Sequence, residues 1–303
     1  MTLHFVLNAG SGAGVAGGLD EVIAARFVDV AFQLHRPASG AQLPALAQQI
    51  ARAATENDVV IAVGGDGTVN AVAAAMRHST AMMGVVPLGT FNYFARALNI
   101  PLDPAGALDV IATGVARTVG VGVVNDAVFL NNASLGLYTA LIREREADKK
   151  RFGRRRIVAM FSAARVLLRG RRPFRLNLDL DGAPGTIATP LVFVGTNPVQ
   201  LKELGFVDIA RPDELVVVAL KPVSRWQMLG LVVRAFFGRL ARADELDAVS
   251  VHTLKLSGTR KRLDVVLDGE IVPMSMPLSF SFEATGLRVI VPTAAVTSMP
   301  EVV

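Results

Sequence analysis

The chain of 303 residues contains no cysteine, which excludes disulfide bonds and thiolate metal sites and fits a reducing compartment such as the cytoplasm. Its four histidines are too scattered to share a metal ion. Long apolar runs are missing as well, because the longest candidate, Trp226–Leu240, is interrupted by Arg234 and Arg239. It falls short of the roughly 20 apolar residues that a membrane span needs, and Leu3–Leu7 is too short for a signal peptide. We expect a cytoplasmic protein without a transmembrane helix.

The composition that remains, 51% hydrophobic and 19% charged residues, is typical of a folded protein, and the length suits two domains. Up to about residue 115, strand patterns alternate with helix patterns, which predicts a doubly wound parallel sheet covered by helices. The expected strands there are Leu3–Leu7, Phe27–Phe32, Val59–Val63 and Met82–Pro87; the expected helices are Ala41–Ala54, one after Thr68, one after Thr90, and one from Asp103-Pro104 to Ala112.

After Gly120 strand patterns dominate, and Gly, Pro and Asp separate most of them, which predicts an antiparallel β-sandwich with a few helices. The expected strands are Ala127–Asn131, Phe174–Leu180, Thr189–Gly195, Leu215–Leu220, Val249–Leu256, Leu263–Leu267, Leu278–Phe282 and Leu287–Val291. The expected helices are Leu135–Ala147, Arg154–Leu168 and Arg225–Arg242.

A glycine turn holding one acid follows the apolar run Val59–Val63: residues 64–68 read Gly-Gly-Asp-Gly-Thr. The pattern predicts a buried strand, a turn and a helix capped by Thr68. Three glycines leave backbone N–H groups unobstructed at the positive end of a helix, an arrangement that binds phosphate. The alternative is a tight connection without a ligand.

Two further loops of this kind follow predicted strands. Asn8–Gly14 is rich in glycine and carries one amide and one hydroxyl, whereas Pro87–Asn92 opens a helix with Thr90 as its expected cap. Loops at the carboxyl ends of neighbouring parallel strands meet in one crevice. The three loops together therefore predict a nucleotide-phosphate site more strongly than any one of them.

A late acid, Asp268, stands in the sequence Leu267-Asp268-Gly269-Glu270 after a predicted strand. The simplest interpretation is an Asp-Gly hairpin turn. In the functional interpretation, Asp268 faces the phosphates across an interdomain cleft and accepts the proton of an attacking hydroxyl. Glu270 would then orient Asp268 or a metal-bound water.

Taken in order, the segments Asn8–Gly12, Gly64–Asn70, Pro87–Arg96, Phe129–Gly136 and Asp268–Glu270 resemble the diacylglycerol and sphingosine kinase family, in particular its soluble bacterial branch. The Gly64–Thr68 element by itself also resembles NAD kinases. The resemblance implies a nucleotide domain over residues 1–120, to which residues 290–303 return, and a lipid-binding β-sandwich over residues 121–289. It also implies ATP, Mg²⁺ and transfer of the γ-phosphate to a hydroxyl of diacylglycerol or a related lipid.

Carried over by motif, Asp268 takes the general-base position, and Asp66 is expected near the Mg²⁺ of ATP. The positions expected to bind the nucleotide are Asn8, Ser11, Gly12, Gly64, Gly65, Asp66, Gly67, Thr68, Asn70, Gly89, Thr90 and Asn92. Asp213 is a candidate ligand of a structural metal.

Three positions depart from the family pattern, because Ala71, Tyr93 and Gly120 stand where acids are usual. Two alternatives therefore stay open. One is a kinase of a soluble small molecule, similar to NAD kinase, and the other is a nucleotide- or lipid-binding protein without activity.

The basic residues are concentrated between Arg143 and Arg175, where the net charge is +10, so the rest of the chain sums to −5. This stretch is either a solvated surface or a contact with anionic lipid, which makes a peripheral membrane association a hypothesis. No stacking aromatics interleave with the charges, so we do not expect nucleic-acid binding. The segment around Trp226 is either core packing or a surface that docks on the bilayer. A homodimer is left open.

Overall fold

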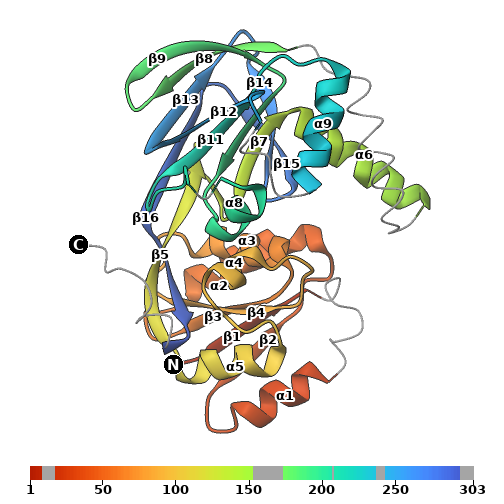
Figure 1. Ribbon diagram of the computed structural model, residues 1–303. Helices are drawn as coiled ribbons and strands as arrows, with labels where there is room; N and C mark the ends of the chain where they lie inside the picture. The colour runs from red at the N-terminus through yellow and green to blue at the C-terminus, as the bar shows by residue number, and fades with distance from the viewer. Residues whose placement is uncertain (9–17, 153–172, 207, 237–242, 294–303) are drawn as a thin grey trace. The chain divides into compact units, whose positions relative to one another are not determined.

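The computed structural model describes residues 1–8, 18–152, 173–206, 208–236 and 243–293 (Figure 1). The chain divides into two compact units, one formed by Met1–Val121 together with Glu283–Val303 and the other by Gly122–Phe282. Two strands, β5 (Val115–Val124) and β16 (Leu278–Val291), contribute residues to both units. The prediction of two separate strands over the second of these segments is wrong, since β16 is continuous.

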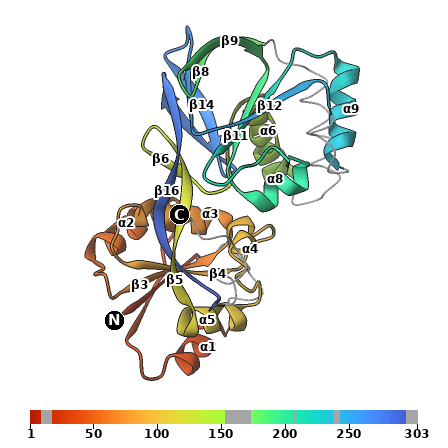
Figure 2. The same ribbon diagram turned by 60° about the vertical axis from the view of Figure 1, so that its left-hand side comes forward.

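The first unit contains a parallel sheet in the order β2-β1-β3-β4-β16. Its other strands are β1 (Leu3–Leu7), β2 (Phe32–His35), β3 (Val59–Gly64) and β4 (Met82–Pro87). Helices α2 (Leu43–Ala53), α3 (Asp66–Met76) and α4 (Tyr93–Ala97) cover one face, and α1 (Leu19–Arg26) and α5 (Pro104–Thr113) cover the other (Figure 2). A one-turn helix, Gly40–Gln42, precedes α2. The predicted doubly wound α/β domain is confirmed.

The second unit consists mainly of two antiparallel sheets. One has the order β12-β11-β10-β7-β14-β15, and in the other β16 pairs with β13, followed by β8 and β9. The strands are β6 (Ala127–Phe129), β7 (Asn132–Gly136), β8 (Phe174–Leu180), β9 (Ala183–Thr189), β10 (Leu191–Gly195), β11 (Leu215–Leu220), β12 (Leu246–Val251), β13 (Thr253–Ser257), β14 (Arg262–Leu267) and β15 (Glu270–Ser275).

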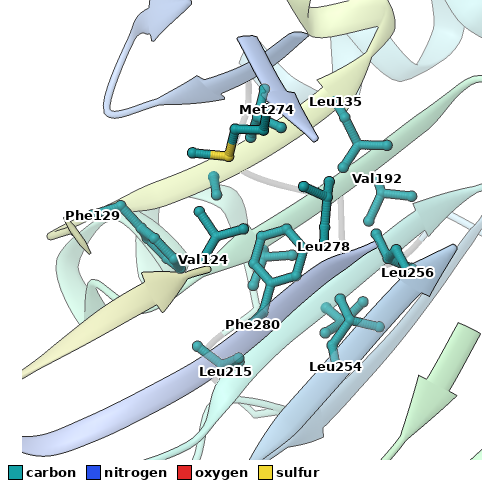
Figure 3. Packing of buried hydrophobic residues seen from close by; sticks show 14 of the residues in the cluster. Val124, Phe129, Leu135, Val192, Leu215, Leu254, Leu256, Met274, Leu278 and Phe280 are labelled. Atoms are coloured by element: carbon teal, nitrogen blue, oxygen red, sulfur yellow. The ribbon is translucent and has the colours of Figure 1, made fainter. Parts of the chain in front are cut away.

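One apolar cluster draws side chains from both sheets (Figure 3). Leu135 and Val192 come from the first sheet, and Leu254 and Phe280 from the second, all of them almost inaccessible to solvent. The rings of Phe280 and Phe129 meet edge to face with 6.5 Å between their centroids. Burial of these faces against each other produces the predicted sandwich.

In the described part of the second unit, three helices accompany the sandwich: α6 (Leu137–Phe152), α8 (Pro198–Leu204) and α9 (Arg225–Phe236). Met228 and Leu231 of α9 pack with Leu137 of α6 in a second apolar cluster, so the core-packing interpretation holds for this face of α9. Trp226 on the same helix is 81% exposed. Among the described residues, no helix has the length and apolar character needed to cross a bilayer. The helix expected over 154–168 lies outside the described residues.

Several predicted boundaries are wrong for physical reasons. Phe27 ends α1, where its ring lies 5.8 Å from that of Phe5, so it packs into the core from a helix end and is not part of a strand. The expected strand Thr189–Gly195 is divided at Pro190, which has no N–H to donate. The expected strand Val249–Leu256 is divided at His252, and its halves join different sheets.

Candidate functional site

The described parts of the three predicted loops lie at the carboxyl edge of the parallel sheet, because β1, β3 and β4 are neighbours; these parts are Asn8 after β1, the turn after β3 and the loop after β4. The Asn8 amide nitrogen donates to the Thr68 hydroxyl at 3.2 Å, and the Leu88 N–H donates to the Gly64 carbonyl at 2.8 Å. The structure thus brings together Asn8, the turn Gly64–Asn70 and the loop Gly89–Asn92. Ser11 and Gly12, the other two predicted residues, lie outside the described part of the chain.

The turn after β3 requires glycine. A Cβ at Gly64 would stand 2.5 Å from the Thr68 hydroxyl oxygen, which is closer than any real contact. Helix α3 begins at Asp66 with Gly65 as its N-cap, so the prediction that Thr68 caps the helix is wrong. Thr68 lies in the first turn, 2% exposed, where its hydroxyl accepts the bond from Asn8. The Thr68 N–H donates to the Gly65 carbonyl at 2.9 Å. The N–H groups of Asp66 and Gly67, which precede it, are the ones that an α-helix leaves without an intrahelical partner at its positive end.

Asp66 connects this turn to the loop after β4. Its two carboxylate oxygens accept hydrogen bonds from the backbone N–H groups of Asn92 at 3.0 Å and Tyr93 at 2.9 Å. Asn92 has left-handed backbone, with φ of 49°, and its side chain bonds both the N–H and the carbonyl of Gly89. Asn92 is the N-cap of α4, so the prediction that Thr90 caps this helix is also wrong.

The two glycine loops touch without side chains between them, since a Cβ on Gly89 would lie 2.8 Å from the Gly65 Cα. A site lined by main chain and closed by glycines fits an anion such as a phosphate. Close by in sequence, the Asn70 Oδ1 atom is buried without a hydrogen-bond partner. This orphaned acceptor fits a hydroxyl or water brought by a ligand.

Potential metal ligands are sparse. Among the described residues, no group of three or more His, Asp or Glu side chains could hold a metal ion. Asp66 is the carboxylate on these glycine loops, and its predicted place near the Mg²⁺ of a nucleotide stays a prediction. Asp213 lies before β11 with left-handed backbone, φ of 59°, and its role as a metal ligand stays a prediction.

In the second unit, Asp268 and Gly269 have φ values of 46° and 93° and form the hairpin turn between β14 and β15. The hairpin interpretation is therefore confirmed, but the carboxylate does more than turn the chain. It accepts backbone N–H bonds from Leu130 at 2.7 Å, Asn131 at 2.8 Å and Asn132 at 2.9 Å. Glu270, the other predicted catalytic residue, is exposed at the start of β15.

Polar residues that were not among the predicted site residues surround this turn. Thr196 donates to the Leu130 carbonyl at 3.1 Å, Asn197 to the Asn131 side chain at 2.9 Å, and the Asn132 amide to Gln200 at 2.9 Å. The Asn132 Oδ1 atom is buried and has no partner. The sequence did contain a signal for this cluster. Asn197-Pro198 follows a strand and starts a helix in the same way as Asp103-Pro104, with a polar cap before a proline.

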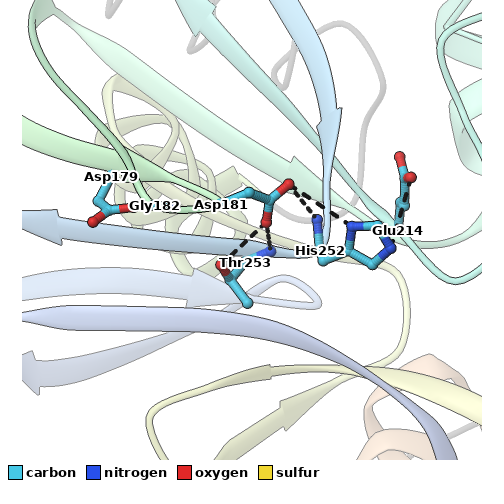
Figure 4. A network of polar contacts seen from close by, with 6 residues as sticks. All are labelled: Asp179, Asp181, Gly182, Glu214, His252 and Thr253. Carbon is cyan, nitrogen blue, oxygen red and sulfur yellow. Dashed lines mark hydrogen bonds and ion pairs between the residues drawn. The ribbon is translucent and has the colours of Figure 1, made fainter.

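A second Asp-Gly turn also has left-handed backbone at both positions. Figure 4 shows the polar contacts of its aspartate. Asp181 and Gly182, with φ of 50° and 87°, connect β8 to β9, and the Asp181 carboxylate accepts N–H bonds from Thr253 at 2.7 Å and His252 at 3.2 Å. Burial acts to raise the pKa of Asp181, but these hydrogen bonds outweigh it and lower the pKa. Within the described residues of this unit, a turn aspartate thus anchors another segment at two places. Of these two aspartates, Asp268 is the one that lies beside the unpartnered Asn132 oxygen and the side chains of Thr196, Asn197 and Gln200.

The second unit also has a pocket of about 230 Å³ at the far end of β14 from Asp268. Its lining combines the apolar side chains Leu135, Phe174 and Leu263 with the guanidinium groups of Arg143 and Arg260. Arg143 also pairs with Asp264. Of the basic stretch 143–175, the side chains at 145–172 lie outside what the structure describes.

Comparisons with known proteins agree with these motifs. Residues 2–124 match the family model of the diacylglycerol kinase catalytic domain. A diacylglycerol kinase of Staphylococcus aureus is 45% identical over 102 residues, which cover 33% of this chain and 32% of that protein. The alignment thus spans about a third of the length of the curated relatives it matches.

Solved structures extend the likeness to the whole chain. A protein of Bacillus anthracis strain Sterne has a TM-score of 0.74 at 18% identity, over 97% of this chain and 96% of that one. A diacylglycerol kinase of the same strain has a TM-score of 0.69 at 20% identity, over 97% and 98%. At such identities the likeness concerns the fold. Residues 2–124 therefore match the diacylglycerol kinase catalytic-domain family, as the motifs predict, and the whole chain shares the fold of these bacterial proteins.

Proposed function

We propose that this chain is an ATP- and Mg²⁺-dependent lipid kinase that phosphorylates a hydroxyl of diacylglycerol or a related lipid. One observation carries the proposal: the carboxylate of Asp66 holds the loop after β4 against the glycine turn after β3, with Asn8 bonded to the same turn. This clamp produces a rigid, glycine-lined site at the edge of a parallel sheet, where nucleotides bind in such folds.

In this proposal the N–H groups that open α3 donate to phosphate oxygens, and the glycines at 64, 65 and 89 let the phosphates approach the main chain. Asn70 offers its unpaired oxygen to a water or hydroxyl of the bound nucleotide. Magnesium, when bound with the nucleotide, neutralises the charge that develops on the phosphates. The protein's own part is to position the triphosphate without side-chain obstruction.

For the transfer step, we assign the proton-accepting role to Asp268. The lipid hydroxyl gives its proton to the carboxylate while its oxygen attacks the γ-phosphorus, and the bond to ADP breaks. The buried, unpartnered oxygen of Asn132, whose N–H already bonds Asp268, supports this assignment because it is an acceptor that could orient a hydroxyl.

The lipid and the membrane are also proposals. The pocket beside Arg143 and Arg260 combines apolar side chains with guanidinium groups, a lining that suits an amphiphile better than a nucleotide cofactor. A peripheral contact of the basic stretch 143–175 with anionic lipid would bring the second unit to its substrate.

The experiment that tests the proposal offers ATP labelled at the γ-phosphate to the full chain, with diacylglycerol in mixed micelles and NAD in parallel. We expect label in the lipid and none in NAD. Label in NAD would identify a soluble-acceptor kinase instead. If the protein binds nucleotide but no acceptor lipid becomes labelled, the result would favour a binding protein without activity. The absence of the usual acids at positions 71, 93 and 120 is the reason for considering that alternative. The variant Asp66→Ala should abolish labelling, whereas Leu102→Ala, a change at an exposed residue of the same unit, should not.

A further inference from the structure

Two aromatic rings, those of Phe91 and Tyr93, belong to the glycine loop after β4 and to the start of α4, at positions that are not among the residues expected to bind the nucleotide. The rings of Phe91 and Tyr93 are parallel within 2°, with 5.5 Å between their centroids. The guanidinium carbon of Arg96 lies 5.5 Å from the centroid of the Tyr93 ring. Phe91 is nevertheless 52% exposed, although it is a large apolar residue.

The backbone on both sides of Phe91 is fixed by the phosphate site itself. On one side, Gly89 is hydrogen-bonded to the side chain of Asn92 and packed against Gly65. On the other side, the carboxylate of Asp66 holds the N–H groups of Asn92 and Tyr93. The stacked pair is therefore preorganised, and a ligand that uses its exposed ring spends little conformational entropy on ordering it.

The exposed ring is also within reach of a nucleotide held by the glycine loops. Phe91 follows Gly89 by two residues, so their Cα atoms are at most about 7 Å apart. Gly89 itself touches Gly65. A phosphate at these glycines would thus place the ribose and base attached to it beside the aromatic pair. A planar base with a π face is the part of ATP that such a ring can hold.

We propose that Phe91, supported from its own loop by Tyr93 and Arg96, is the platform on which the purine base of ATP stacks. The inference rests on the proposed function and adds the base-binding part of the site. It also gives a reason for Tyr93, which stands where an acid is usual in the family: the aromatic ring backs Phe91, and the cation of Arg96 stabilises the stack by a cation–π contact.

The test compares two ligands that share the phosphates but differ in the base. The affinities of the full chain for ADP and for inorganic tripolyphosphate are measured by calorimetry with Mg²⁺ present, for the unchanged protein and for Phe91→Ala, Phe91→Tyr and Leu102→Ala. Leu102 is the matched control, since it is 50% exposed and lies in the same unit. Loss of base stacking in Phe91→Ala should weaken ADP binding roughly 5- to 150-fold. Tripolyphosphate binding should stay within about twofold, and Phe91→Tyr should bind ADP normally.

Other results overturn the inference in distinguishable ways. If Phe91→Ala binds ADP as well as Leu102→Ala does, the base stacks elsewhere, while the phosphate site stands. If ADP and tripolyphosphate weaken equally in Phe91→Ala, the ring only supports its loop. If the unchanged protein binds neither ligand, the proposed nucleotide site itself fails and the platform with it.

Discussion

Replacement of Asp268 by asparagine separates its structural role from its chemical one, because the chain carries a matched control. Asp268 and Asp181 both occupy the first position of an Asp-Gly turn with left-handed backbone, and both carboxylates accept backbone N–H groups from another segment. Asp268→Asn and Asp181→Asn should therefore perturb the fold in the same way. Only the first should remove a proton acceptor.

The size of the structural effect follows from the bonds. In Asp268 one oxygen accepts from Asn131 and Asn132 and the other from Leu130. An asparagine has one oxygen and one NH₂ group, so one of these backbone N–H groups faces the NH₂ group and loses its acceptor. In Asp181→Asn, the N–H that loses its acceptor is that of His252. Loss of one hydrogen bond to a charged group costs about 1.5–3 kcal/mol, and we expect each variant to lose about this much unfolding free energy.

The assay measures γ-phosphate transfer to diacylglycerol at a temperature where both variants are folded, together with urea unfolding followed by circular dichroism. Asp268→Asn should lose about 10²- to 10⁴-fold in kcat, while Asp181→Asn keeps most of it. Because ADP binds in the first unit in this account, both variants should bind ADP as the unchanged protein does. If kcat of Asp268→Asn stays within about threefold of that of Asp181→Asn, Asp268 is a turn anchor only and the assignment of the base is wrong.

Two further predictions concern the first unit. Gly89→Ala places a Cβ 2.8 Å from the Gly65 Cα, so the loops must separate; we expect a stability loss of about 1–3 kcal/mol by urea unfolding and ADP binding weakened at least about tenfold by calorimetry. Normal binding would contradict the contact. Hydrogen bonds from Thr55 and Thr2 lower the pKa of Asp58 to about 2. The contribution of Asp58 to the free energy of unfolding should thus be full above the unfolded pKa near 3.8 and decrease as the pH drops toward 2. After allowance for solvent screening, Asp58→Asn should lower the free energy of unfolding by about 1–2 kcal/mol at neutral pH, and by progressively less below pH 4, as measured by urea unfolding. If the difference between the variant and the unchanged protein did not depend on pH, the lowered pKa of Asp58 would not contribute to stability.

The sequence predicted best those elements whose pattern is local and strong. The six residues of β3 are all buried, and a continuous apolar run before a glycine turn indicated such a strand. The pair Asp103-Pro104 indicated the start of α5, where the Asp103 side chain accepts the Gly106 N–H at 2.8 Å. The order of neighbouring parallel strands then made it predictable that Asn8 and the loops after β3 and β4 meet.

The sequence could not predict features that depend on distant partners. Thr68 and Thr90 are typical helix-capping residues, but Gly65 is the N-cap of α3 and the left-handed Asn92 is the N-cap of α4. The side chain of Asn92 is bonded to the Gly89 N–H, a contact that the sequence pattern did not indicate. The clamp by Asp66 joins a carboxylate to main-chain N–H groups 26 and 27 residues away, and any residue type there supplies the same donor. The division of the expected strand Val249–Leu256 at His252 likewise follows from sheet pairing and not from local preference.

The central claim is that a nucleotide's phosphates bind where the glycine loops after β3 and β4 meet. The most direct measurement is a backbone amide NMR spectrum of the full chain, recorded during titration with Mg²⁺ and ADP. We predict that the largest shifts occur at the amides of residues 65–68 and 89–93. Saturable shifts that leave these amides unchanged and concentrate elsewhere would contradict the account.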